Sequence, residues 1–405
     1  MNETFLIIGG GQSGSQAVDS LRREGFDGRL VLVGEEQELP YQRPPLSKKY
    51  LAGEMSDDRL PFRHRAFYEE HRVDLRLGTR VLRLDCAARV AELDGGERIR
   101  YDRALLALGA APRRLACPGA QLPGVHVLRS AADAAAIRAR FSPDARVVIV
   151  GGGYIGLETA ATCRHLGLSA TVLEMADRVM NRVVAPAVSA YFERAHRAHG
   201  VRIDCGARVA AIEGRDRVER VICADGSRHD ADIVIVGIGA TPVVDLALAS
   251  GLAVEDGILV DERCRTSDPS VFAAGDCTNH PSPHYGRRLR LESVDNAFEQ
   301  AKVAASNMVG KDVIHDRVPW FWSDQYQHKL LIVGLSAGHD RVVVRGEPDS
   351  GAFSVLYLRD RELIVLESVD DSKDYMAARK LIASRARIDP ARAQDRHREL
   401  KDCLA

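Results

Sequence analysis

The fold of this chain is decided near its start by the stretch Phe5-Leu6-Ile7-Ile8-Gly9-Gly10-Gly11-Gln12-Ser13-Gly14. A short apolar run leads directly into glycines spaced as Gly-x-Gly-x-x-Gly, which is typical of a strand, a tight turn and a helix. Gly9 permits the turn, Gly11 lets the backbone approach a pyrophosphate, and Gly14 lets the helix pack on the strand. The stretch therefore predicts a nucleotide-binding βαβ unit.

An acidic residue follows at the distance that such a unit needs. The apolar run at residues 30–34 ends on Glu35, which lies 21 residues after Gly14. A carboxylate there accepts hydrogen bonds from ribose hydroxyls, and the helix N-terminus attracts the phosphates. Glycine turns after strands are common, so the glycines alone are weak evidence. The agreement of strand, helix and acid makes the prediction strong.

The same pattern returns in the middle of the chain, at Gly151, Gly153, Gly156 and Glu174. The glycines again follow an apolar run, residues 147–150, and the acid lies 18 residues after Gly156. The segments 73–108 and 201–239 both consist of short strand patterns separated by turns. We therefore expect two dinucleotide-binding halves that are internal duplicates.

A third feature indicates which nucleotide each half binds. The apolar run at residues 271–274 leads through Gly275 to Asp276, a position suited to hydrogen-bonding the ribityl chain of a flavin. The alternative is that Asp276 only caps a turn. Together with the N-terminal fingerprint it predicts FAD in the first half and a nicotinamide in the second. Glu174 would repel a 2'-phosphate, so NADH is favoured over NADPH, although Arg178 nearby opposes that preference.

Composition excludes several other classes of protein. The chain has 405 residues and a formal net charge of -1, so its overall charge indicates no nucleic acid and no anionic membrane as a partner. No apolar run reaches the length of a membrane span, and the N-terminus has no secretory pattern. We therefore expect a cytoplasmic protein that binds neither nucleic acid nor a membrane.

The cysteines are scattered and show neither a Cys-x-x-Cys pair nor the spacing of metal ligands. We interpret them as reduced, mostly buried thiols, and we expect no metal site. They are Cys86, Cys117, Cys163, Cys205, Cys223, Cys264, Cys277 and Cys403.

From residue 318 onward the pattern changes to that of a third domain. Antiparallel strands are expected at residues 330–333, 341–345, 353–358 and 362–366, and a helix is expected at residues 375–384. The arginine-rich segment after Pro390 is interpreted as a loosely held, solvated terminus.

Three stretches carry a resemblance to a known family: Leu39-Pro40-Tyr41-Gln42-Arg43-Pro44-Pro45-Leu46-Ser47-Lys48, Arg290-Leu291-Glu292-Ser293-Val294-Asp295-Asn296-Ala297 with Gln300-Ala301, and Pro319-Trp320-Phe321-Trp322-Ser323-Asp324-Gln325. Together with the fingerprints, the chain resembles, along nearly its whole length, the FAD-dependent pyridine nucleotide reductases. It is most similar to the ferredoxin and rubredoxin reductases of bacterial oxygenase systems. The resemblance implies an α/β fold with two Rossmann-like domains of the glutathione-reductase type and a C-terminal α+β interface domain. The implied boundaries are 1–112 with 240–317 for FAD, 113–239 for NAD and 318–405 for the interface domain.

The resemblance also implies roles for individual residues. Lys48 would lie beside the hydride-accepting flavin nitrogen, Arg43 and Arg113 would contact the phosphates or adenosine of FAD, and the amide of Val294 would face the pyrimidine end of the flavin. The predicted FAD site comprises Gly9, Gly11, Ser13, Gly14, Glu35, Arg43, Lys48, Val81, Ala107, Arg113, Asp276, Val294 and Trp322. The predicted NAD site comprises Gly151, Gly153, Tyr154, Ile155, Gly156, Glu158, Glu174, Arg178, Gly237, Ile238 and Gly239. The predicted catalytic residues are Lys48, Glu158 and Trp322.

Each of these roles has a plainer alternative. Lys48 would stabilise the charge of a reduced flavin and pair with Glu158, or it is a surface lysine. Glu158 lines the nicotinamide pocket or only complements a helix dipole. Of Trp320 and Trp322, we expect one to face the flavin and the other the core, and the resemblance assigns the flavin to Trp322.

The predicted activity is that of an NADH-dependent ferredoxin reductase. Hydride would pass from NADH to FAD, and single electrons would then pass to a 2Fe-2S ferredoxin that feeds a cytochrome-type or ring-hydroxylating oxygenase. The alternatives are a rubredoxin reductase and a non-catalytic NADH-sensing flavoprotein. A disulfide or peroxide reductase of this fold needs a nucleophilic cysteine early in the chain, and no cysteine precedes Cys86.

Small ferredoxins are acidic, so a basic docking patch is expected near the flavin. The candidates are Arg287, Arg288, Arg290 and Lys302, and the alternative is that they form an ordinary solvated charged face.

Overall fold

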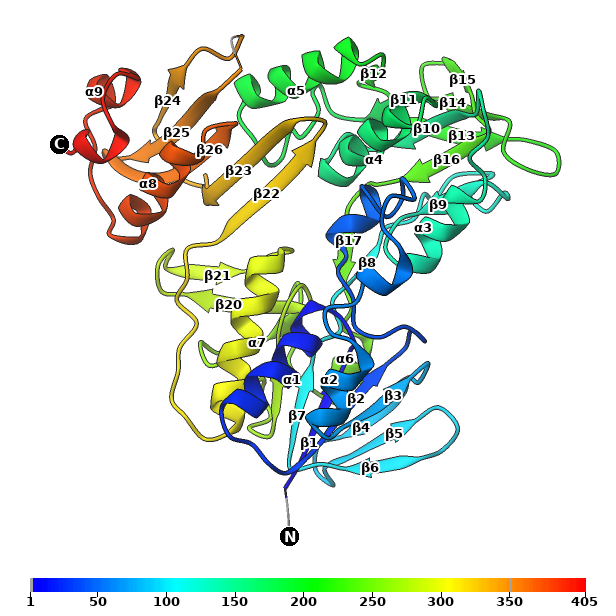
Figure 1. Ribbon diagram of the computed structural model, residues 1–405, viewed down its shortest axis with the longest axis vertical. Helices are drawn as coiled ribbons and strands as arrows, with labels where there is room; N and C mark the ends of the chain where they lie inside the picture. Colours follow the sequence, from blue (N-terminus) through cyan, green and yellow to red (C-terminus); the bar gives the residue numbers. More distant parts are fainter. Residues whose placement is uncertain (1–2, 350) are drawn as a thin grey trace. The chain divides into compact units, whose positions relative to one another are not determined.

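The computed structural model describes residues 3–349 and 351–405. The chain forms two compact units, shown in Figure 1. The first unit consists of residues 1–42, 57–111 and 240–317, and the second consists of residues 43–56, 112–239 and 318–405. Among the described residues, no helix is both long and apolar enough to cross a lipid bilayer.

A five-stranded parallel sheet forms the centre of the first unit, in the order β19-β7-β1-β2-β3. Its strands are β1 (Thr4–Ile8), β2 (Arg29–Gly34), β3 (Val73–Leu77), β7 (Arg103–Leu106) and β19 (Val271–Ala273). Helices α1 (Gln12–Arg23) and α7 (Val294–Met308) pack on one face, mainly through alanine, valine and leucine side chains. Both faces are covered, which explains why the central strands are continuous apolar runs.

Smaller elements complete the first unit. A three-stranded antiparallel sheet packs on the face of the parallel sheet that is opposite to α1 and α7. It consists of β4 (Val81–Asp85), β5 (Val90–Leu93) and β6 (Arg98–Arg100). The remaining elements are η2 (Asp57–Arg59), α2 (Arg65–Glu70), α6 (Asp245–Ala249), β18 (Ile258–Leu259), β20 (Thr278–Ser282) and β21 (Arg287–Leu289). Strands β8 (Ala110–Pro112) and β17 (Ala240–Pro242) pair where the chain leaves this unit and returns to it.

The second unit contains another five-stranded parallel sheet, in the order β12-β11-β10-β16-β9. Its strands are β9 (Val125–Val127), β10 (Arg146–Val150), β11 (Ser169–Glu174), β12 (Arg202–Cys205) and β16 (Ile233–Val236). The accompanying elements are α3 (Ala131–Arg138), α4 (Tyr154–His165), α5 (Pro186–Ala198), β13 (Val209–Glu213), β14 (Arg220–Cys223) and β15 (Arg228–Asp230). In both sheets the fingerprint strand lies in the middle, next to the strand that delivers the acid.

An antiparallel sheet forms the C-terminal part of the second unit, in the order β22-β23-β26-β25-β24. It consists of β22 (Trp320–Gln325), β23 (His328–Gly334), β24 (Arg341–Gly346), β25 (Phe353–Arg359) and β26 (Glu362–Val369). Helix α8 (Ser372–Ala383) packs on this sheet. The predicted fold class is confirmed: two Rossmann-like parallel sheets are joined to a C-terminal domain of antiparallel sheet and helix.

The expectation of a loosely held C-terminus is wrong. The segment folds into α9 (Pro390–Gln394) and η3 (Leu400–Asp402), and Leu400 and Cys403 are buried. The reason is the buried guanidinium of Arg345, which pairs with Asp374 at 2.7 Å and donates to the carbonyl oxygen of Ala393 at 3.0 Å. A buried charge needs such acceptors, and the backbone of the tail supplies them.

Three buried histidines predict that acid destabilises the fold. Burial lowers the pKa of His196 to about 4, of His280 to about 3 and of His315 to about 4. Between these values and the unfolded value near 6.5, the unfolded chain binds protons that the folded chain does not. The free energy of unfolding therefore decreases as the pH falls from about 6.5 to 4, by at most about 1.4 kcal/mol per pH unit for each histidine.

We expect the variant His280→Phe to show a shallower decrease in this pH range, measured as the urea midpoint at each pH. Phenylalanine at the exposed His64 is the control and should leave the slope unchanged. An unaltered slope in His280→Phe would contradict the assignment.

Candidate functional site

In the first unit, the three glycines of the first fingerprint have different environments. Gly9 has a φ of +117°, and a Cβ added to it would lie 2.2 Å from the carbonyl oxygen of Ala107. A Cβ on Gly14 would lie 1.9 Å from the carbonyl oxygen of Gly9. Around Gly11, the described part of the chain places no other atom within 4 Å of that position. Gly9 and Gly14 therefore allow close packing, whereas Gly11 leaves space where a pyrophosphate would approach the start of α1.

Three other residues predicted to contact FAD lie near this turn. The hydroxyl of Ser13, on α1, donates to the carbonyl oxygen of Ala297 on α7 at 3.1 Å. The amide of Ala107 donates to the carbonyl oxygen of Ile8 at 2.8 Å, which places it beside the end of β1. Val81 is buried in the apolar core at the start of β4. The side chains of Ser13 and Val81 thus have structural contacts, and their contact with a cofactor stays a prediction.

The acid of the first fingerprint lies where the sequence placed it. Glu35 directly follows β2, and its side chain is 66% exposed. Its carboxylate forms an ion pair with Arg80, which the sequence analysis did not identify. Both groups are on the surface, so a ribose hydroxyl can reach the carboxylate.

Asp276 follows Gly275 in a turn that is held by a buried glutamine. The Oε1 atom of Gln300 accepts from the amide of Gly275 at 2.7 Å and from the hydroxyl of Thr278 at 2.8 Å. Its Nε2 atom and the Oδ1 atom of Asn296 are buried and have no hydrogen-bond partner among the described residues. Buried polar atoms normally have partners, so this pair fits a polar ligand next to the turn. A flavin with its ribityl chain is such a ligand.

Sequence reasoning assigned no role to Gln300 and Asn296. They lie one turn apart on α7, and both belong to the stretch on which the family resemblance rests. Val294 is the first residue of the same helix, and its amide is among those that have no partner within a helix. The spacing of polar residues along one helix face was the signal that could have identified Gln300 and Asn296.

The second unit repeats the glycine arrangement. Gly151 has a φ of +109°, and a Cβ on it would lie 2.3 Å from the carbonyl oxygen of Gly237. A Cβ on Gly156 would lie 2.1 Å from the carbonyl oxygen of Gly151. Near Gly153, the described residues again leave the Cβ position open to 4 Å. The start of α4 therefore offers a second cradle for a pyrophosphate.

The acid of the second fingerprint is fixed at this turn. Glu174 accepts hydrogen bonds from the amide of Gly152 at 2.6 Å and from the amide of Ala176 at 2.8 Å. The carboxylate is therefore held at the turn, and its contact with the ribose of NAD stays a prediction. Arg178 is half-buried nearby and donates to the carbonyl oxygen of Asn181 at 3.0 Å. Its side chain is thus partly committed to the protein.

The remaining residues of the predicted NAD site lie around the same cradle. Tyr154 begins α4 and packs against Phe321, with ring centroids 4.5 Å apart. Ile155 is 51% exposed, an unusual state for an isoleucine beside a glycine turn. Ile238 packs on the core, and Gly239 has a φ of +100°. The exposed isoleucine fits a surface that a bound nucleotide would cover.

A partly buried ion pair forms at Glu158, on the second turn of α4. The Nζ atom of Lys48 is 2.6 Å from the Oε2 atom of Glu158, as the sequence analysis suggested. Glu158 is 6% exposed. Lys48 follows the short 3-10 helix η1 (Pro44–Ser47) and also donates to the carbonyl oxygen of Pro44 at 3.3 Å. The plainer readings, a surface lysine and a dipole-complementing acid, do not describe these residues.

Two serines complete the surroundings of the carboxylate, and the sequence analysis gave them no role. The hydroxyl of Ser47 donates to Oε2 of Glu158 at 2.6 Å, and the hydroxyl of Ser323 donates to Oε1 at 2.7 Å. The carbonyl oxygen of Ser47 in turn accepts from the hydroxyl of Thr162 at 2.8 Å. Three donors, two from residues 47–48 and one from β22, therefore hold the carboxylate of Glu158.

The two predicted arginines are placed differently. The guanidinium of Arg43 donates to the carbonyl oxygen of Arg129 at 2.8 Å and is half-buried. Arg113 is exposed, and its amide donates to the carbonyl oxygen of Gly239 at 2.9 Å. Their contact with FAD stays a prediction.

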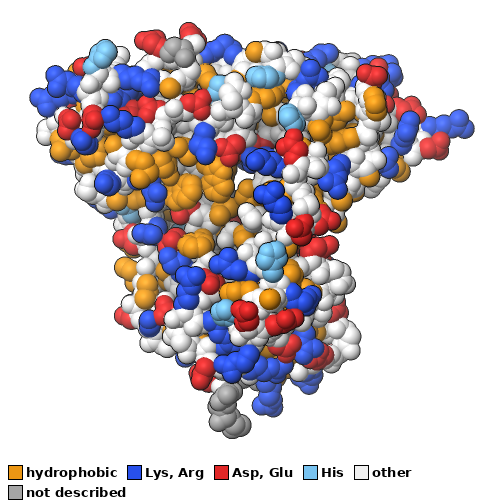
Figure 2. Space-filling view, viewed as in Figure 1, with side chains coloured by type: hydrophobic (Ala, Val, Ile, Leu, Met, Phe, Trp, Pro, Cys, Tyr) orange, Lys and Arg blue, Asp and Glu red, His pale blue; other side chains and the backbone are white. Residues whose placement is uncertain are grey.

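The expectation for the two tryptophans is wrong in part. Trp320 and Trp322 lie two positions apart on β22 and therefore share a face of the strand. Their ring centroids are 5.4 Å apart. Trp320 packs against the core beside Tyr375 and under Arg379. Figure 2 shows apolar side chains gathered over α8 and the adjoining part of β22.

The thiols are unreactive. Burial raises the pKa of all eight cysteines, so none is a thiolate near neutral pH. All eight are unpaired. The protein therefore has no activated sulfur nucleophile.

Two of the four residues of the expected basic patch are paired with carboxylates within the first unit. Arg290 pairs with Asp256 at 2.9 Å and also with Glu292, and Lys302 pairs with Glu299 at 3.3 Å. Arg288 donates to the side-chain oxygen of Asn279 and to the backbone. Arg287 and Arg288 are both exposed, and neither has a carboxylate partner recorded among the described residues, so half of the expected patch keeps its positive charge.

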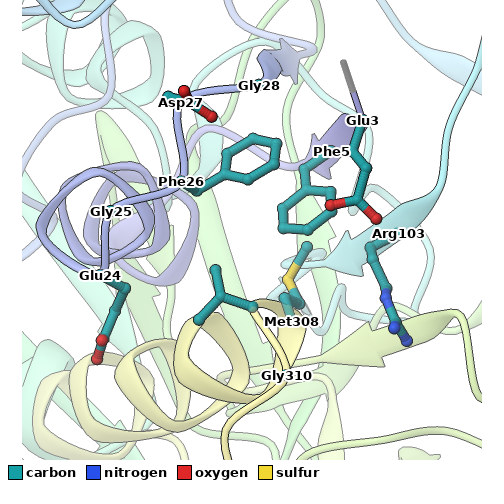
Figure 3. A pocket seen from close by; sticks show the side chains of 11 residues that line it. Glu3, Phe5, Glu24, Gly25, Phe26, Asp27, Gly28, Arg103, Met308 and Gly310 are labelled. Carbon is teal, nitrogen blue, oxygen red and sulfur yellow. The ribbon is translucent and has the colours of Figure 1, made fainter. Parts of the chain in front are cut away.

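A cavity of about 470 Å³ in the first unit is not part of these sites. It is lined by Phe5, Phe26 and Met308, with Glu24 and Arg103 at its edge (Figure 3). Phe5 lies near the start of β1, whereas the glycine turn follows the end of that strand. Ligands of parallel α/β sheets bind at the carboxyl ends of the strands, so this cavity lies at the opposite end of the sheet from the expected ligand site.

Two separate cradles for dinucleotides, a partly buried ion pair at one of them and unreactive thiols define the class: an oxidoreductase that uses two nucleotide cofactors and no sulfur relay. Comparison with known proteins then identifies the family. Residues 3–301 match the family described as pyridine nucleotide-disulphide oxidoreductase, and residues 320–404 match the reductase C-terminal family. The chain therefore belongs to the pyridine nucleotide-disulphide oxidoreductase family.

Individual relatives are similar along their whole length. The rhodocoxin reductase of Rhodococcus erythropolis is 43% identical over 403 residues, which cover 99% of this chain and 94% of that protein. The putidaredoxin reductase chain in a covalent complex with putidaredoxin matches with a TM-score of 0.95, 39% identity and coverage of 99% and 98%. A ferredoxin reductase for the CYP199A2 system from Rhodopseudomonas palustris matches with a TM-score of 0.96, 41% identity and full coverage of both chains.

The two kinds of glycine predict two kinds of defect. Gly11→Ala adds a methyl group in open space, so the protein should fold but bind FAD at least about tenfold more weakly, because the pyrophosphate loses its close approach. Gly14→Ala drives the methyl group into the backbone of Gly9, so soluble folded protein should be lost. Circular dichroism and the flavin content of purified protein distinguish the outcomes. Full flavin content in Gly11→Ala would contradict the placement of the cofactor.

Proposed function

We propose that this protein is an NADH-dependent ferredoxin reductase of an oxygenase system, with FAD in the first cradle and NADH in the second. Support comes from the two cradles, from the unreactive thiols and from relatives that are named as reductases of rhodocoxin and putidaredoxin. The observation that carries the proposal is the Lys48–Glu158 pair, a charged and hydrogen-bonded group placed on the helix that begins at the second cradle. The proposed domains are 1–112 with 240–317, 113–239 and 318–405.

The residues of the chain perform the binding and positioning. When bound, FAD accepts two electrons as a hydride and releases them singly, which couples a nicotinamide to a one-electron acceptor. The amides at the starts of α1 and α4 bind the two pyrophosphates. Glu174, oriented by the amide of Gly152, accepts from the ribose and disfavours a 2'-phosphate, so NADH is preferred. Lys48 supplies a positive charge in a partly buried site, and Glu158 orients it.

The alternatives fit less well. A disulfide or peroxide reductase needs a thiolate, and burial raises the pKa of every cysteine in the chain. A non-catalytic NADH sensor needs no acceptor protein, whereas the relatives are named as reductases of such proteins. Rubredoxin as the acceptor in place of a 2Fe-2S ferredoxin is distinguished by the experiment below. The unpaired cysteines favour a reducing compartment, and we propose the cytoplasm as the location of this protein.

The experiment combines anaerobic flavin reduction with electron transfer. NADH should bleach the flavin rapidly, and NADPH should do so much more slowly. Cytochrome c reduction should then require added 2Fe-2S ferredoxin. A long-lived charge-transfer complex that reduces neither ferredoxin nor ferricyanide would favour the sensor. Transfer to rubredoxin but not to ferredoxin would change the assigned acceptor.

A further inference from the structure

A continuous chain of hydrogen bonds runs inward to Glu158 through the second unit. It begins at Tyr326, in the turn between β22 and β23, and passes through one histidine, one glutamine and one serine. The contacts are Tyr326 Oη to His196 Nδ1 at 3.2 Å, His196 Nε2 to Gln325 Oε1 at 2.8 Å, Gln325 Nε2 to Ser323 Oγ at 3.1 Å, and Ser323 Oγ to Glu158 Oε1 at 2.7 Å.

The carboxylate fixes the direction of every bond in this chain. Ser323 has one proton and gives it to Glu158, so it must accept from the Nε2 atom of Gln325. The Oε1 atom of Gln325 then faces His196, which must carry its proton on Nε2. The Nδ1 atom of His196 therefore accepts from the hydroxyl of Tyr326. Only neutral His196 satisfies this pattern, and burial lowers the pKa of His196 to about 4.

The residues that form this series of hydrogen bonds are buried, in a place where packing alone would favour apolar side chains. Ser323, Gln325 and His196 are each 0% exposed, and each forms hydrogen bonds on both sides. Buried polar groups add little stability over apolar groups of the same shape, but losing one partner is costly. Ser323 and Gln325 lie on the same face of β22, and His196 comes from α5. Two segments far apart in the sequence thus supply polar groups that converge on one carboxylate.

We propose that Gln325 and His196 are positioning residues for the NADH reaction: by orienting the hydroxyl of Ser323 toward Glu158, they keep that carboxylate aligned with Lys48. The inference rests on the proposed function, which places Glu158 at the nicotinamide site. No proton is transferred along the chain, since the amide of Gln325 serves only as donor on one side and acceptor on the other.

Few titratable groups among the described residues face Glu158 and His196 in this series of hydrogen bonds. Glu158 is faced by Lys48 from the segment after η1 and by Tyr154 one turn earlier on α4. His196 is faced by His199, which directly follows α5, by Tyr326 and by His328 on β23. Lys48 therefore supplies the cation recorded at Glu158, and the hydroxyls of Ser47 and Ser323 supply the other hydrogen bonds to its carboxylate.

The decisive variant is Gln325→Glu, which keeps the shape but removes the N–H donor. The hydroxyl of Ser323 should then turn toward the new carboxylate, and Glu158 loses a charge-assisted hydrogen bond. We expect flavin reduction at saturating NADH to slow at least about tenfold, because Glu158 no longer aligns Lys48, whereas flavin content and the Kd of NAD⁺ measured by calorimetry should stay near the wild-type values. Ser323→Ala removes the same bond from the nearer end and should give the same split between rate and affinity even if Gln325→Glu fails to fold.

Tyr191→Phe is the matched control. The hydroxyl of Tyr191 forms a 2.9 Å hydrogen bond with His328, so it also joins α5 to the C-terminal sheet, but it is not part of the chain. Its rate of flavin reduction at saturating NADH should equal that of the wild type. Wild-type rates in Ser323→Ala and Gln325→Glu, or an equal loss of rate in Tyr191→Phe, would overturn the inference. A wild-type flavin that NADH does not reduce would instead overturn the proposed function.

Discussion

The carboxylate of Glu158 is buried, and donors surround both of its oxygens. Lys48 and Ser47 share one oxygen and Ser323 occupies the other, at 2.6 to 2.7 Å. Removing a charge from water costs several kcal/mol, and this cost is recovered only when geometry and hydrogen bonds are both good. The donors come from the 3-10 helix before Lys48 and from the first strand of the C-terminal sheet. The local arrangement of the second unit therefore depends on satisfying one charge on α4.

The glycine turns impose the second constraint. In each parallel sheet, one glycine allows the backbone of a neighbouring strand to pass within contact distance, and another allows the helix to approach the turn. Gly11 and Gly153 are not needed for packing, and they mark where each cradle opens to a ligand. The two cradles have the same geometry but different surroundings. The second unit has the Lys48–Glu158 ion pair, whereas in the first unit the buried polar atoms of Gln300 and Asn296 have no hydrogen-bond partner among the described residues. These differences suit two different nucleotides.

The sequence predicted the features that depend on short spacing. The glycines, their strands and their acids lie within a few tens of residues, so periodicity and turn chemistry identify both cradles and the fold class. The Lys48–Glu158 pair needed the family resemblance, because 110 residues separate the two. The series of hydrogen bonds from Tyr326 to Glu158 could not be predicted, since buried polar contacts between distant segments leave no periodic signal in the sequence. The docked C-terminus was missed for the same reason: it is held by Arg345 on β24, which is about 50 residues earlier in the sequence. The tryptophan error was one of strand geometry, because residues two apart share a face.

The central claim is that Lys48 and Glu158 act as one unit in the reaction with NADH. A double-mutant cycle tests it most directly, with Lys48→Met, Glu158→Gln and the double variant compared by anaerobic stopped-flow reduction of the bound flavin. If the ion pair is the functional element, the double variant should be about as slow as the slower single variant, because the second change removes an interaction that is already lost. Fully additive losses in activation free energy would contradict the account.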